Sequence, residues 1–261
     1  MHTIRNYIMA ESLEQAWELN QKGRNNVIIG GNLWLKMGNR NILNAIDLST
    51  LGLDRIEEDE GGFRIGCMAT LRDIEIHEGL NKEFQNLFKE AVRHIVGVQF
   101  RNCATVGGSI FPKLGFSDVL TAFLACDTQV ILYKKGEVSL REFIYMPTDN
   151  DILTHIYVKK DGRKTAYESF RMTETDFPTL TCAMAMVDGR FETVLGARPK
   201  HAEVVIDEEL ADSLSKEDVA SYAKRVIDKL QYSSNIRGSE KYRKQLSKVL
   251  ISRCISRLTE E

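Results

Sequence analysis

Pairs of adjacent glycines are the residues of this chain whose spacing points most directly to chemistry. They occur at Gly30-Gly31, Gly61-Gly62 and Gly107-Gly108 in a sequence of 261 residues. Consecutive glycines carry no Cβ atoms, so their backbone N–H groups can face one concavity and approach an anion closely. The first and third pairs follow β-branched apolar residues, and together they could hold both phosphates of a diphosphate. A tight turn is the simpler interpretation of any single pair.

The spacing of the glycines excludes the two common nucleotide-binding loops. No two glycines are separated by a single residue, so the dinucleotide-binding fingerprint Gly-x-Gly-x-x-Gly is absent. Gly61 and Gly66 have the spacing of a P-loop, but Cys67 stands where that loop requires lysine. Because Gly61-Gly62 follows an acidic run, we expect it to form a hairpin turn.

Composition and charge exclude several other classes of protein. Lys and Arg number 35 against 37 Asp and Glu, so the formal charge of −2 gives no reason to expect nucleic acid or an anionic membrane as a partner. The five cysteines lie far apart without a Cys-x-x-Cys motif, and the five histidines form no close pair, so no metal site is predicted. We expect a soluble, cytoplasmic protein with no membrane span.

The elements that position the first and third glycine pairs alternate between strands and helices. A capping box at residues 12–15 predicts a helix to about residue 22, and a short buried strand over 27–29 precedes Gly30. The apolar stripe over residues 84–96 predicts one helix facing a core, followed by an irregular segment over 99–115 that contains Gly107-Gly108. Further elements of this half are strands at 41–47, 63–68 and 129–133, a short helix from residue 70, and a helix over 117–126.

The second half of the chain is predicted to contain strands followed by helices. Strands are predicted at 152–158, 165–172 and 179–187, and amphipathic helices at 219–230 and 242–254. The strand over 179–187 is apolar on both sides, which predicts that both of its faces are covered.

At the glycine pairs the chain resembles a known family, the FAD-binding (medium) subunits of molybdenum hydroxylases of the xanthine dehydrogenase and carbon monoxide dehydrogenase types. The first match is Val27-Ile28-Ile29-Gly30-Gly31-Asn32-Leu33-Trp34, which is similar to that family's first flavin-binding loop. The second flavin-binding loop is matched by Arg101-Asn102-Cys103-Ala104-Thr105-Val106-Gly107-Gly108-Ser109. Further matches in order are Ser117-Asp118, Phe170-Arg171 with Asp176-Phe177, and Arg237-Gly238-Ser239-Glu240-Lys241-Tyr242-Arg243.

The resemblance implies an α+β protein with a two-lobed FAD-binding fold of the vanillyl-alcohol-oxidase (PCMH) type over residues 1–160. A small C-terminal α/β domain of strands and two helices would follow over residues 161–261. It also implies a complex with a molybdopterin-binding subunit and a [2Fe–2S] subunit, in which electrons reach FAD and then NAD or another acceptor. The flavin performs the electron transfer itself, so no side chain is expected as a catalytic acid or base.

Carried over by position, the resemblance assigns cofactor contacts to two phosphate-binding loops and three further residues. The assigned residues are Val27, Ile28, Ile29, Gly30, Gly31, Asn32, Leu33, Trp34, Thr105, Val106, Gly107, Gly108, Ser109, Asp118, Leu153 and Arg171. One departure is Ser109, because the family's second loop commonly ends in asparagine and a hydroxyl has a shorter reach and one donor fewer than an amide. Valine at Gly107 or Gly108 is expected to abolish FAD retention and leave the chain folded.

Simpler interpretations exist for several of these residues. Asp118 also fits a helix's first turn, where the macrodipole favours acidic residues. Arg171 could stabilise the negative charge on a reduced flavin, or pair at the surface with Glu168 or Glu174. Trp34 could cover the adenine or lie in the core. The functional alternatives are a self-sufficient flavin oxidoreductase of the same fold and a flavin-free scaffold subunit.

Overall fold

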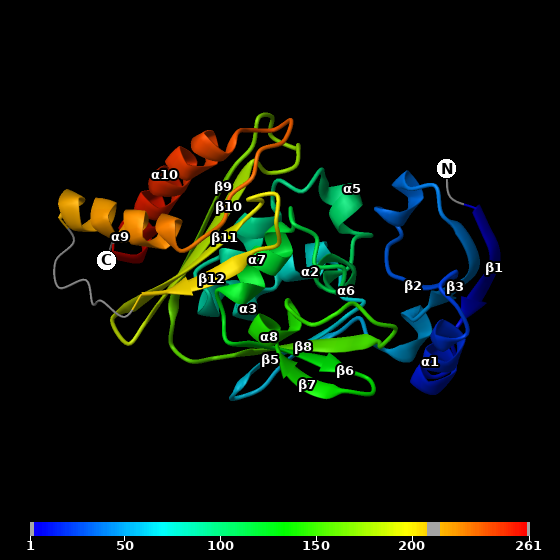
Figure 1. Cartoon of the computed structure of the whole chain (residues 1–261). Helices are drawn as coiled ribbons and strands as arrows, with labels where there is room; N and C mark the ends of the chain where they lie inside the picture. Colours follow the sequence, from blue (N-terminus) through cyan, green and yellow to red (C-terminus); the bar gives the residue numbers. More distant parts are fainter. Residues whose placement is uncertain (1–2, 208–214, 260–261) are drawn as a thin grey trace. The chain divides into compact units, whose positions relative to one another are not determined.

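The computed structural model describes residues 3–207 and 215–259, which form two compact units (Figure 1). The described residues of the first unit fall within Met1–Asp73, Val98–Pro112 and Thr128–Val158, and those of the second within Ile74–Gly97, Lys113–Asp127 and Lys159–Glu261. Each unit is therefore assembled from separate segments of the chain.

The first unit contains a three-stranded parallel sheet that carries the first glycine pair at the end of one strand. Its strands are β1 (Thr3–Met9), β3 (Asn41–Asp47) and β2 (Asn26–Ile29), in that order across the sheet. Helix α1 (Leu13–Gln21) packs against β2 and β3 (Figure 1). The predicted cap at Ser12 is confirmed, because Ser12 Oγ accepts the Gln15 N–H at 3.1 Å, whereas Gln15 Oε1 accepts the N–H of Glu11 at 2.7 Å rather than that of Ser12.

A second, five-stranded sheet completes the first unit. Its order is β4 (Ile56–Glu58), β5 (Gly62–Gly66), β8 (Leu153–Lys159), β6 (Thr128–Leu132) and β7 (Gly136–Ser139). The predicted hairpin turn at Gly61-Gly62 is confirmed, since Asp59 Oδ1 accepts both of the glycine N–H groups at 2.7 Å. The short helical elements outside the second unit are η1 (Leu35–Met37), η2 (Ser49–Leu51), α2 (Leu71–Ile76, which runs into the second unit), α5 (Val98–Arg101), α6 (Val106–Ile110) and α8 (Leu140–Phe143).

The second unit is a four-stranded antiparallel sheet covered by helices on both faces. Its order is β12 (Glu203–Ile206), β11 (Arg190–Gly196), β10 (Leu180–Val187) and β9 (Lys164–Phe170). Helices α9 (Lys216–Asp228) and α10 (Glu240–Thr259) cover one face (Figure 1), where Cys182 of β10 meets Cys254 of α10. On the other face Thr181 contacts Thr121 of α7 (Asp118–Leu124) at 3.0 Å. The prediction that this strand is covered on both faces is confirmed.

The predicted single helix over residues 84–96 is wrong, although its apolar stripe is buried as expected. Within it only α4 (Leu87–Val92) is helical, and the separate helix α3 (Glu78–Glu83) ends just before the segment begins. Gln85 and Asn86 between them adopt left-handed φ values of 45° and 62°, a conformation that asparagine tolerates better than most residues. Gln85 Oε1 accepts the backbone N–H of Thr165 at 2.6 Å, which fixes the break against β9.

The mixture of helices and sheets confirms the α+β class. Among the helices of the described residues, none has both the length and the apolar character needed to cross a bilayer.

Candidate functional site

The first glycine pair packs directly against residues 103–105, the segment that precedes the second pair. A Cβ atom on Gly31 would lie 1.7 Å from the carbonyl oxygen of Cys103, and one on Gly30 would lie 2.3 Å from Thr105 Oγ1. Real Cβ atoms do not approach other atoms so closely, so both positions require glycine. The structure thus brings together the two segments that sequence analysis singled out, with Gly31 against the backbone of Cys103 and Gly30 against the side chain of Thr105.

Asn32 lies at the tip of this turn and has an unusual environment. Its backbone adopts a left-handed φ of 56°, and its side-chain Oδ1 is buried without a hydrogen-bond partner in the described part of the chain. Within the same described residues, the backbone N–H groups of Gly31, Asn32 and Leu33 have no acceptor. A buried acceptor without a donor costs about 1–3 kcal/mol. This turn therefore offers an acceptor and several donors to a bound group.

The second glycine pair lies in a short helix rather than in the irregular segment that we expected. The residues of α6 begin at Val106, and the preceding Thr105 caps the helix by accepting the Gly108 N–H at 3.2 Å. The N–H groups of Val106 and Gly107 donate to the carbonyls of Ala69 and Cys67 at 2.8 and 2.9 Å. The N–H of Gly107 is therefore used within the fold and does not face an anion.

The two glycines of this pair have different surroundings. A Cβ on Gly107 would lie 2.7 Å from both the Cβ and the carbonyl oxygen of Cys67, so Gly107 serves close packing. Gly108 is exposed, and a Cβ there would meet only Thr105 Oγ1 at 2.9 Å. Ser109 is buried, and its hydroxyl donates to the Thr105 carbonyl at 3.0 Å. Gly108 is thus the member of the pair with an open side.

The remaining predicted residues of the first unit lie around these turns and strands. Val27, Ile28 and Ile29 form β2, which ends at the first glycine pair. The half-buried Trp34 contacts Phe100 edge to face, with ring centres 5.3 Å apart. Leu153 is buried at the start of β8, opposite Leu132 of β6. These contacts are apolar packing within the first unit.

Asp118 and Arg171 form a buried ion pair within the second unit. Asp118 Oδ2 lies 2.7 Å from Arg171 Nη2, with only 5 % and 6 % of the two side chains exposed. Tyr167 donates its hydroxyl to Asp118 Oδ1 at 2.5 Å, so both carboxylate oxygens have partners. Burial raises the pKa of Asp118, an effect that the charge of Arg171 and the Tyr167 hydrogen bond oppose. The pKa of Tyr167 is raised well above its ordinary value, chiefly by burial.

The alternative interpretation of Arg171, a surface pair with Glu168 or Glu174, is wrong, because the side chain of Arg171 is buried and pairs with Asp118. Glu168 binds Arg257 at 2.5 Å, and Glu174 lies 3.9 Å from His94. Tyr167 was missed by sequence analysis. The signal that could have found it is the period of a strand, which places Tyr167 on the same side of β9 as Arg171, four residues further on.

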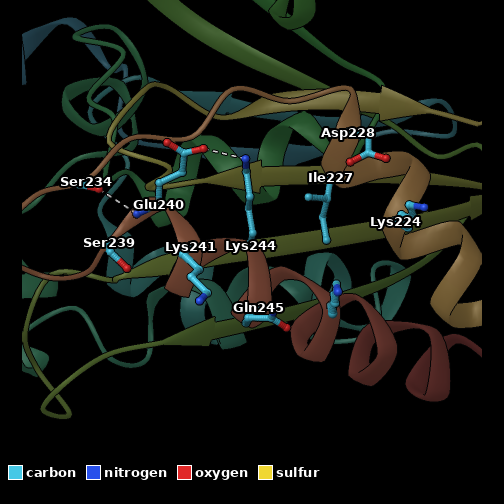
Figure 2. A pocket seen from close by; sticks show the side chains of 10 residues that line it. Lys224, Ile227, Asp228, Ser234, Ser239, Glu240, Lys241, Lys244 and Gln245 are labelled. Carbon is cyan, nitrogen blue, oxygen red and sulfur yellow. Dashed lines mark hydrogen bonds and ion pairs between the residues drawn. The ribbon is translucent and has the colours of Figure 1, made fainter.

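A groove of about 590 Å³ lies between α9 and α10 and contains none of the predicted residues. In Figure 2 the lysine side chains along it point in different directions, and Lys244 binds Glu240 at 2.6 Å. The groove therefore does not gather its charges around one point, and its lining residues all belong to the second unit.

Comparisons with known proteins agree on one family. The sequence pattern of the family described as "FAD binding domain in molybdopterin dehydrogenase" matches residues 2–158. The glyceraldehyde dehydrogenase medium chain of Sulfolobus acidocaldarius is 26% identical over 267 residues, covering 94% of each chain. The uncharacterized protein YgfM of Escherichia coli is 26% identical over 195 residues, covering 71% of each. The structure of carbon monoxide dehydrogenase from Hydrogenophaga pseudoflava includes a chain that superposes with a TM-score of 0.86 at 22% identity, over 97% of this chain and 96% of that one.

Proposed function

Because the chain belongs to the family of FAD-binding domains of molybdopterin dehydrogenases, we propose that it carries electrons from a [2Fe–2S] partner through FAD to NAD or another acceptor. Family membership makes FAD its cofactor and the chain a flavin oxidoreductase subunit of the molybdenum hydroxylase type. The expected FAD-binding fold of the vanillyl-alcohol-oxidase (PCMH) type is confirmed by the structural likeness.

The observation that links FAD binding to particular residues of this chain is the unpaired Oδ1 of Asn32. It is buried beside backbone N–H groups that also lack partners in the described residues. A cofactor with a diphosphate and ribose hydroxyls supplies acceptors and donors of the kind this turn requires. The residues therefore fit FAD, and the turn at Gly30-Gly31-Asn32 is proposed to bind its polar middle. FAD, when bound, supplies the electron transfer.

The other predicted contacts have distinct proposed roles. Gly108, whose own N–H donates to Thr105 Oγ1, is proposed only to leave room for a phosphate beside α6, whereas Gly107 keeps the helix close to Cys67. Trp34 and Leu153 are proposed to provide apolar surface near the cofactor. From the family resemblance alone we propose that Arg171 contacts the flavin, and the structure shows that Asp118, itself bound by Tyr167, holds its guanidinium.

The partners and the location form part of the same proposal. The glyceraldehyde dehydrogenase relative is itself called a medium chain. We propose that this chain likewise assembles with a molybdopterin-binding subunit and a [2Fe–2S] subunit in the cytoplasm. The division into a domain over residues 1–160 and another over 161–261 also remains a proposal.

Absorbance spectroscopy of the full chain tests the proposed function. Purified protein, or protein reconstituted with FAD, should show the flavin bands, and Asn32→Gly should lower FAD affinity by about tenfold or more, as loss of one well-placed hydrogen bond predicts. Glycine keeps the left-handed backbone at this position, so the fold should remain. The matched control is Asp188→Gly, which changes another left-handed residue, at φ 50°, in the second unit's β10–β11 turn and should not affect FAD.

The outcomes separate the alternatives. A chain that cannot be reconstituted with FAD would be a flavin-free scaffold. Rapid reduction of the bound flavin by a small organic substrate, without a partner subunit, would identify a self-sufficient oxidoreductase. Reduction of the bound flavin by NADH alone, which is the reverse of the proposed electron flow, would support NAD as the acceptor.

A further inference from the structure

Asp176 connects two arginines that come from different segments of the second unit. Its Oδ1 lies 3.1 Å from Arg237 Nη2, while its backbone carbonyl accepts a hydrogen bond from Arg171 Nε at 3.1 Å. Arg237 precedes α10, whereas Arg171 directly follows β9. Asp176 thus bridges Arg171, the arginine of the buried ion pair, and Arg237, which lies just before α10.

Arg237 is held in one orientation by contacts on several sides. Its guanidinium carbon lies 4.8 Å from the centre of the Phe177 ring, and its backbone N–H donates to Asn235 Oδ1 at 2.9 Å. Its Nε is buried and has no hydrogen-bond partner among the described residues. Since an unsatisfied buried donor is unfavourable, the ion pair and the ring contact must maintain this orientation.

The segment that carries Arg237 is itself anchored to the sheet. Arg243 is buried, and it donates to the carbonyl of Ser233 at 2.8 Å, to Asn235 Oδ1 at 2.6 Å and to the carbonyl of Thr179 at 2.9 Å. Thr179 immediately precedes β10. Arg237 therefore reaches Asp176 from a rigid base rather than from a free loop.

We propose that Arg237 is a positioning residue that acts through Asp176 to fix the orientation of Arg171. This inference rests on the proposed function, which places Arg171 toward the flavin. The Arg171 guanidinium is anchored by Asp118, by Ser169 Oγ at 2.6 Å and by the Asp176 carbonyl. Loss of the contact between Arg237 and Asp176 lets that carbonyl move, so the guanidinium becomes less well fixed. A cation near a flavin stabilises the negative charge gained on reduction, so its displacement lowers the reduction potential.

The test compares two variants of this contact with a matched control in the FAD-loaded full chain. Arg237→Gln removes the charge, and Asp176→Asn removes the opposite charge but keeps an oxygen to accept the Phe177 N–H. The control is Arg225→Gln, which breaks another ion pair of the second unit, that of Arg225 with Asp207. Both test variants should lower the midpoint potential of the flavin and change FAD affinity by less than about threefold, and the control should leave the potential unchanged.

A second measurement does not require FAD. The titration of the Asp118 carboxyl can be followed by carbon NMR, with its resonance assigned through loss of the signal in Asp118→Asn. Arg171 and Tyr167 are the groups that face this carboxylate and oppose the effect of burial on its pKa. A less fixed Arg171 should raise the pKa of Asp118 in Arg237→Gln and Asp176→Asn relative to the native chain, and not in Arg225→Gln.

The outcomes distinguish this inference from the proposed function. Native potential and native Asp118 titration in both test variants would overturn the positioning role while leaving FAD binding intact. A chain that binds no FAD would overturn the proposed function, and the NMR titration alone would then decide whether Arg237 fixes Arg171. If Arg237→Gln does not fold, Asp176→Asn provides both measurements.

Discussion

Asp118 Oδ2 and Arg171 Nη2 lie 2.7 Å apart in an almost wholly buried ion pair. Arg171→Met should destabilise the chain by about 3 kcal/mol, because it leaves a buried carboxylate without its cation. Adding Asp118→Asn to this variant should recover part of the loss. Chemical denaturation of the single and double variants measures both effects, and equal stability of Arg171→Met and the native chain would contradict the pairing.

The same pair predicts a pH dependence with a defined sign. Burial raises the pKa of Asp118 in the folded chain above its unfolded value of about 3.9, so the folded state binds this proton more tightly. The stability that this tighter proton binding contributes is fully present below the pKa that Asp118 has in the unfolded chain. It is lost as the pH rises through the pKa of Asp118 in the folded chain. In Arg171→Met the folded pKa should rise further, so its deficit in unfolding free energy should be largest near neutral pH and shrink toward pH ~4. A deficit that grows on acidification would contradict this sign.

Gly31 should tolerate no side chain, because its missing Cβ would overlap the carbonyl oxygen of Cys103 at 1.7 Å. Gly31→Ala is expected to lower the free energy of unfolding by about 3 kcal/mol or more, since the obstructing atom belongs to the backbone. The control is Gly23→Ala, where a Cβ has no neighbour within 4 Å and a change within about 0.5 kcal/mol is expected. Thermal unfolding followed by circular dichroism compares the two, and similar values would show that the turns do not pack as described.

The glycines of α6 should respond differently to valine, which revises the expectation from sequence that either substitution leaves the chain folded. Gly107→Val should disrupt folding, because the new side chain would meet Cys67 at 2.7 Å. Gly108→Val should remain folded, because this position is exposed, and should lose FAD affinity by about tenfold or more. Circular dichroism and flavin absorbance together separate the two effects. Full FAD retention in Gly108→Val would remove α6 from the proposed phosphate site.

Cys103 should be the thiol that reacts first with an alkylating reagent in the folded chain. It is exposed, whereas Cys67, Cys126, Cys182 and Cys254 are buried. Burial raises the pKa of the Cys67 thiol to about 12, which leaves almost no reactive thiolate at neutral pH. Mass mapping after brief alkylation, with and without denaturant, measures the order of reaction. Early modification of any buried cysteine would indicate local opening of the fold.

Much of the local structure followed from the sequence because it depends on neighbours along the chain. The cap at Ser12, the turn at Gly61-Gly62 and the two-faced burial of β10 were all predicted and all found. In each case the signal is a short-range hydrogen bond or a period of apolar residues. The two glycine pairs likewise marked the segments that the fold brings into contact.

Tertiary structure decided the features that depend on partners distant in the sequence. The stripe over residues 84–96 has a helical period, yet a hydrogen bond from Thr165 to Gln85 helps fix a break that the period does not reveal. Arg171 has glutamates nearby in sequence, but the fold places Asp118 of α7 beside it instead. Residues 107 and 108 are both glycine, and their roles differ because Cys67 packs against Gly107 alone. Residue type and spacing therefore determined which groups are available, and packing between distant segments decided which of them meet.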